Sequence, residues 1–138
     1  MMTTQNKALL LVAEDDPDDQ YFLQEAIEVV CAERVKTHFV FDGAQLMNFL
    51  REKGVDKKQP NLVVLDLNMK VKDGRKSLLD IKTDPAFTNI PVVVLTTSDN
   101  EEDMEYCKQH GAAEYYQKPS SIMELVKIIR TLCTDYLS

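Results

Sequence analysis

The sequence predicts an α/β protein built on a doubly wound sheet of five parallel strands, and three observations carry this prediction. Segments with strand and helix patterns alternate five times along the chain. Three of the strand segments are nearly continuous apolar runs, which is typical of strands buried on both faces. The connections from each strand to the next helix are short, which implies right-handed crossovers with helices on both faces of the sheet.

The first strand and helix are expected within residues 9–31. The apolar run at 9–13 stops abruptly at Glu14. Asp16 then suits a helix N-cap, and Pro17 suits the first helical turn. Apolar residues recur at helical spacing as far as about Cys31, namely Phe22, Leu23, Ala26, Ile27 and Val30.

Two further strands are expected before the middle of the chain. Residues 35–40 form a short strand pattern, and Asp42 precedes a helix that ends near Gly54. Residues 51–60 are polar and predict a solvated loop. The apolar run 62–65 then delivers Asp66 to the carboxyl end of the third strand, the edge where open α/β sheets bind ligands. Taken alone, Asp66 could equally be a simple loop cap.

The second half repeats the pattern. The segment Asp73-Gly74 is a turn signal, and the helix after it stops before Asp84-Pro85. A fourth strand is expected at 92–95, running into Thr96. The next helix contains Met104 and Cys107 and is closed by Gly111. A fifth strand at 113–117 precedes Lys118-Pro119. The final helix has a sustained apolar stripe: Ile122, Leu125, Val126, Ile129, Leu132, Cys133 and Tyr136.

Composition excludes several classes of protein. A length of 138 residues predicts one domain, 1–138 with a core at about 8–137, and leaves no room for an output domain. The net charge of -7 argues against a nucleic-acid partner. Three widely spaced cysteines form neither a disulfide framework nor a metal cluster, and each is expected to be a small buried hydrophobe. No signal peptide or membrane span is recognisable, so we expect a cytoplasmic protein without a membrane partner.

The polar residues at the predicted strand ends form one cluster. They are Glu14, Asp15, Asp66, Thr96 and Lys118. Carboxylates packed together repel unless a cation joins them, and a few carboxylates with open positions suit Mg²⁺. A lysine ammonium suits a phosphate-sized anion. The set therefore predicts phosphoryl transfer, with a carboxylate able to act as nucleophile.

With these residues, the chain resembles the receiver domain of two-component response regulators, the CheY-like type. The resemblance rests on Glu14-Asp15, Leu65-Asp66-Leu67-Asn68 with Asp73-Gly74, Thr96, and Lys118-Pro119, in that order. The intervals of 30 residues from Asp66 to Thr96 and 22 from Thr96 to Lys118 also agree. The segment Leu95-Thr96-Thr97-Ser98 and the long loop before the third strand look most like those of stand-alone regulators paired with bacterial phytochrome kinases. The resemblance implies a flavodoxin-like (βα)5 fold with strand order 2-1-3-4-5.

The resemblance also implies roles for single residues. Asp66 would accept a phosphoryl group from the phosphohistidine of a sensor histidine kinase. Asp15, Asp66 and the Asn68 backbone carbonyl would bind Mg²⁺, while Glu14 would hold a metal-bound water. Lys118 would pair with Asp66 or its phosphate. Thr96 would move its hydroxyl onto the phosphate, and Tyr115 would follow it as an aromatic switch, changing the surface around the fourth and fifth strands that a downstream protein reads.

Two residues depart from the family pattern. Lys70 stands where the family usually has proline, so the loop is expected to be less rigid and to bring a positive charge near the site. Thr97 is bulkier than the alanine or glycine often found after the switch threonine, and it is expected to narrow access to the phosphate.

Other acids have simpler explanations. Asp16, Asp18 and Asp19 are expected to be an N-cap and solvated first-turn residues. Glu101, Glu102, Asp103 and Glu105 are expected to form a solvated helix face. Tyr115 could be only a half-buried strand aromatic, but its context favours the switch role.

The alternative to a signalling receiver is a Mg²⁺-dependent phosphohydrolase with an aspartyl nucleophile. Such enzymes usually carry a second aspartate two residues later as general acid, and this chain has Asn68 there. The family often pairs through the face formed by the fourth helix, fifth strand and fifth helix. Met123 and Ile128 lie off the main stripe of the last helix and could supply exposed apolar area for a homodimer.

Overall fold

A computed structural model describes residues 7–52 and 58–138, and its centre is one parallel five-stranded sheet. The order β2-β1-β3-β4-β5 confirms the predicted topology. Every neighbouring pair of strands runs parallel, as short strand-to-helix connections require. The strands are β1 (Ala8–Ala13), β2 (Val35–Val40), β3 (Leu62–Leu65), β4 (Val92–Thr96) and β5 (Glu114–Gln117).

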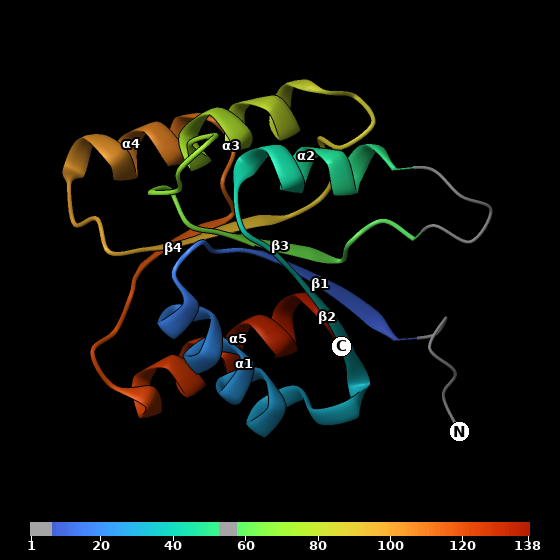
Figure 1. Cartoon of the computed structure of the whole chain (residues 1–138), viewed down its shortest axis with the longest axis vertical. Helices are drawn as coiled ribbons and strands as arrows, with labels where there is room; N and C mark the ends of the chain where they lie inside the picture. Colours follow the sequence, from blue (N-terminus) through green and yellow to red (C-terminus); the bar gives the residue numbers. More distant parts are fainter. Residues whose placement is uncertain (1–6, 53–57) are drawn as a thin grey trace.

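Helices cover both faces of the sheet, so the molecule has three layers (Figure 1). Helices α1 and α5 pack on one face, and α2, α3 and α4 on the other. The helices are α1 (Pro17–Cys31), α2 (Gly43–Arg51), α3 (Gly74–Thr83), α4 (Glu101–Gln109) and α5 (Ile122–Tyr136), with a short 3-10 helix η2 (Ala32–Arg34) after α1.

Acidic side chains begin the first three helices. Asp16 accepts hydrogen bonds from two backbone amides of α1, Asp42 from one of α2, and Asp73 from one of α3. Just after the C-terminus of α4, Gly111 has φ +90°, the left-handed conformation expected of a residue that closes a helix. Helix α2 ends at Arg51, and the predicted end near Gly54 lies outside the described residues.

The core has two parts, one on each face of the sheet, and it corrects the predicted apolar stripes. On α1 the buried residues are Leu23, Ala26, Ile27 and Cys31, whereas Phe22 is 48% exposed. Met104 in α4 is also exposed. Met123 is exposed as predicted, but Ile128 is half-buried and packs against the core beneath α5. All three cysteines are buried, as predicted.

Among the described residues, no helix combines the length and apolar character that crossing a membrane requires.

Candidate functional site

The register of the sheet brings the polar strand ends to one level. Ala13 of β1 lies opposite Leu65 of β3, and Leu65 lies opposite Val94 of β4. The residues that follow these positions therefore emerge together at the carboxyl edge of the sheet. The Asp66 amide donates to the Ala13 carbonyl at 3.1 Å, which fixes the end of β3 against β1.

Lys118, directly after β5, is the centre of the cluster. Its ammonium lies 2.5 Å from Glu14, 2.7 Å from Asp19 and 2.9 Å from Asp66. The Lys118 side chain is only 12% exposed. Burial alone would lower its pKa, but the three carboxylates outweigh burial and hold the pKa above the ordinary value. Lys118 is therefore charged at neutral pH.

Three carboxylates form a candidate cation site beside Lys118. Oxygens of Glu14, Asp15 and Asp66 lie within 4.8 Å of one another. Burial raises the pKa of Glu14 to about 7, and the neighbouring charge of Asp66 adds to this, against the opposing effect of Lys118. One ammonium cannot neutralise these acids together with Asp19, so a divalent cation is favoured at this position. Hard oxygen donors of this kind fit Mg²⁺ or Mn²⁺.

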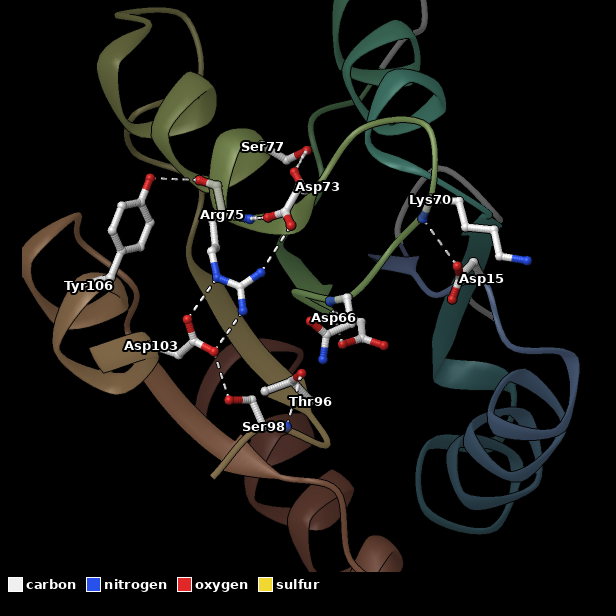
Figure 2. Close-up of polar contacts among 11 residues, drawn as sticks. Asp15, Asp66, Lys70, Asp73, Arg75, Ser77, Thr96, Ser98, Asp103 and Tyr106 are labelled. Carbon is white, nitrogen blue, oxygen red and sulfur yellow. Dashed lines mark hydrogen bonds and ion pairs between the residues drawn. The ribbon is translucent and has the colours of Figure 1, made fainter. Parts of the chain in front are cut away.

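The loop after β3 is fastened to the same carboxylates. The Asn68 amide donates to Asp66 at 3.1 Å, and the Lys70 amide donates to Asp15 at 3.2 Å (Figure 2). A proline at position 70 could not make the second bond, because it has no N–H. The Lys70 side chain is exposed, and no contact in Figure 2 joins its ammonium to Asp15.

Gly74 explains why the segment Asp73-Gly74 follows the phosphoacceptor candidate. The Gly74 amide donates to the Leu67 carbonyl at 3.0 Å, which brings the start of α3 against the backbone of Asp66. A Cβ atom at Gly74 would collide with the Asp66 carbonyl oxygen. The glycine therefore permits a close backbone approach that no larger residue could make without a shift.

The two predicted switch residues meet at Ser98. Thr96 is fully buried at the end of β4, and its hydroxyl accepts a long hydrogen bond of 3.5 Å from the Ser98 amide. The Tyr115 hydroxyl donates to the Ser98 carbonyl at 2.8 Å. Thr97, which lies between Thr96 and Ser98 in the sequence, is exposed. Thr96 and Asp66 lie on neighbouring strand ends in Figure 2.

Two acids that were expected to be solvated form ion pairs instead. Asp19 pairs with Lys118, and Asp103 is 15% exposed and pairs with Arg75 of α3. Both predictions were wrong because the cations lie far away in sequence. A local signal existed for Asp19 alone, since the first turn of α1 starts at the sheet edge that carries Glu14 and Asp15. Nothing in the sequence near Asp103 indicated Arg75.

The family comparison agrees with this geometry. Residues 10–130 match the response regulator receiver domain, and the chain belongs to that family of two-component signalling proteins.

The similar proteins include cyanobacterial regulators. The response regulator Rcp1 of Synechocystis is 35% identical over 131 residues, which cover 94% of this chain and 88% of Rcp1. A structure described as the phosphorylated cyanobacterial phytochrome response regulator RcpA superimposes with a TM-score of 0.86 at 34% identity, covering 96% of this chain and 95% of that one. The Mn²⁺-bound form of Rcp1 gives a TM-score of 0.84 at 33% identity, with 95% of each chain covered. Homologues with a divalent metal thus share this fold, and the acidic cluster here has the donors for one.

Proposed function

We propose that Asp66 is the phosphoacceptor of this receiver. An oxygen of its carboxylate attacks the phosphorus of a phosphohistidine, the P–N bond breaks, and the imidazole leaves with a proton. The observation that carries the proposal is the position of Asp66, whose carboxylate lies 2.9 Å from the Lys118 ammonium and within 4.8 Å of oxygens of Glu14 and Asp15. Lys118, together with a cation bound by the carboxylates, would place positive charge around the transferring phosphoryl group, as this chemistry needs.

Mg²⁺ is the cation we propose for the acidic cluster. Asp15 and Asp66 would bind it directly, with the Asn68 backbone carbonyl as third protein ligand and Glu14 holding a metal-bound water. The bound ion would neutralise charge on the phosphoryl oxygens. The chain itself orients the ligands through the amides of Asn68 and Lys70.

Thr96 and Tyr115 are the proposed switch residues. A phosphoryl group on Asp66 adds negative charge and strong acceptor oxygens. Lys118 and the Thr96 hydroxyl would move onto those oxygens, and Tyr115 would follow Thr96. The surface of β4, α4 and β5 would then bind a downstream protein differently in the two states.

The phosphoryl donor we propose is a sensor histidine kinase of the phytochrome type, since RcpA is described as a phytochrome response regulator and is 34% identical to this chain. A phosphohydrolase is less favoured because the position of its general acid is Asn68, whose backbone amide donates to Asp66 and whose side chain is an amide rather than a carboxylic acid. An amide side chain cannot protonate a leaving alcohol.

The test is Mg²⁺ with acetyl phosphate, followed by intact mass measurement. One phosphoryl adduct that is stable in acid, labile in base, dependent on Mg²⁺ and absent in Asp66→Asn supports the proposal. No adduct on the wild-type chain would overturn it. Rapid turnover of varied phosphate esters would favour the hydrolase instead.

We also propose that phosphorylation favours a homodimer through α4, β5 and α5. Exposed apolar side chains occur on this face at Met104 and Met123. The exposed acids Glu101 and Glu105 of α4 complement the exposed bases of α5, Lys127 and Arg130. Light scattering with and without beryllofluoride, a phosphoryl mimic, tests this: a monomer in both states would reject it.

A further inference from the structure

A second polar network lies outside the carboxylate cluster, between α3 and α4. The Arg75 guanidinium meets the Asp103 carboxylate through two hydrogen bonds, Nε to Oδ1 at 2.7 Å and Nη2 to Oδ2 at 2.6 Å (Figure 2). The hydrogen bonds from Arg75 and, to a smaller extent, from the Ser98 hydroxyl lower the pKa of the Asp103 carboxyl. A two-bond guanidinium–carboxylate pair fixes both distance and orientation. It therefore sets the spacing of the two helices.

The network continues into the loop that follows the Thr96 strand. The Ser98 hydroxyl donates to Asp103 Oδ2 at 2.7 Å and accepts from the Asn100 amide at 3.2 Å. The Ser98 carbonyl accepts from Tyr115, and the Ser98 amide faces the Thr96 hydroxyl. Ser98 is thus tied to α4, to β5 and to the switch threonine by different atoms.

The other end of the network reaches the segment after Asp66. Arg75 also pairs with Asp73, the N-cap of α3, at 3.0 Å. Its backbone carbonyl accepts from the Tyr106 hydroxyl of α4 at 3.0 Å. Since Gly74 brings this turn against the Asp66 backbone, the network spans from the phosphoacceptor strand to the switch loop.

We propose that Arg75, Asp103 and Ser98 form a clasp that holds the β4–α4 loop in its present arrangement and thereby limits how readily Thr96 reaches a phosphoryl group on Asp66. The proposal rests on the function proposed above, because it concerns regulation of the same site. The Thr96 hydroxyl accepts from the Ser98 amide, so a movement of Thr96 onto a phosphate oxygen must either carry the loop at Ser98 with it or break this bond. The chain two residues later is held by Asp103 and Tyr115, so the clasp opposes that movement. If the clasp is stronger in the unphosphorylated arrangement than in the phosphorylated one, that difference in free energy shifts the equilibrium toward the unphosphorylated arrangement.

The experiment measures beryllofluoride affinity in the presence of Mg²⁺ by ¹⁹F NMR. Asp103→Asn and Ser98→Ala are expected to bind about fivefold more tightly or better than wild type, as a coupling free energy of about 1 kcal/mol requires. Amide resonances of Thr97 and Ser98 in the variants without beryllofluoride are expected to move along the line toward their positions in the bound wild type. A purely structural role would change stability without moving them along that line.

Asp80→Asn is the matched control. Asp80 also belongs to α3 and forms ion pairs with Lys72 and Lys76, and among the described residues it makes no hydrogen bond or ion pair with Ser98 or Tyr115. It is expected to bind beryllofluoride as the wild type does. If Asp103→Asn and Ser98→Ala bind beryllofluoride with the same affinity as Asp80→Asn, the proposal that the clasp restrains Thr96 is overturned. A wild type that binds no beryllofluoride would instead overturn the phosphoacceptor function itself.

Discussion

The Lys118 ammonium lies 2.9 Å from the Asp66 carboxylate, and both side chains are nearly buried, 12% and 5% exposed. Four carboxylates and one ammonium share this small volume. Removing one carboxylate should relieve repulsion, whereas removing the ammonium should increase it.

We therefore predict opposite effects on stability in the absence of divalent cations. Asp66→Asn should raise the free energy of unfolding by about 1 kcal/mol, and Lys118→Met should lower it by about 3 kcal/mol because buried acids lose their partner. Urea denaturation in EDTA measures both. Changes of the same sign in the two variants would contradict this electrostatic account.

Asp103 gives a prediction for the pH dependence of stability. Its pKa in the folded protein is lowered below 3.8, first by its hydrogen bond to Arg75. A depressed carboxyl pKa contributes stability that is fully present above the unfolded pKa and is lost as the pH falls through the folded pKa. The difference in unfolding free energy between wild type and Asp103→Asn should be constant above about pH 5 and shrink below about pH 4. A difference that does not change between pH 7 and pH 3 would show that the pair does not stabilise the fold.

Val71 predicts a stabilising substitution in the loop after β3. It has φ +36° and is 83% exposed, so a β-branched residue occupies left-handed backbone without compensating burial. Val71→Gly should raise the free energy of unfolding by about 1 kcal/mol. Val29→Gly is the matched control, since Val29 is 68% exposed within α1, where glycine should cost about 0.5–1 kcal/mol. Thermal denaturation measures both, and destabilisation by Val71→Gly would remove the argument for strain.

Thr97 predicts the lifetime of the phosphorylated state. Its side chain is exposed directly after the buried Thr96. Thr97→Gly should open a path for water and shorten the lifetime of the Asp66 phosphate about threefold, a barrier change of about 0.7 kcal/mol. Decay of the phosphorylated species on a phosphate-affinity gel gives the rate. Equal lifetimes would mean that Thr97 does not gate the site.

The sequence was sufficient for the architecture because its signals are local. Apolar runs that stop at Glu14, Asp66 and Thr96 identify buried strands and their ends, and the parallel topology then brings those ends together. The predicted cluster of Glu14, Asp15, Asp66 and Lys118 is assembled accordingly.

The remaining contacts depend on tertiary neighbours that no local pattern encodes. Asp19 meets Lys118 across 99 residues of chain, and Arg75 meets Asp103 across 28. Both acids lie in first turns of helices, where an acid also favours the helix dipole, so the local explanation was complete without the partner. The prediction that Phe22 is buried was wrong for a related reason. Helical spacing places Phe22 beside the apolar stripe of α1, but α5 packs over Leu23 instead.

The most direct measurement is a crystal structure of the chain with Mg²⁺ and beryllofluoride. We predict beryllium on the Asp66 carboxylate, Lys118 and the Thr96 hydroxyl on its fluorides, and Mg²⁺ held by Asp15, Asp66 and the Asn68 carbonyl. Beryllofluoride on another residue, or an Asp66 that still pairs only with Lys118 at saturating beryllofluoride, would contradict the assignment of Asp66 as phosphoacceptor.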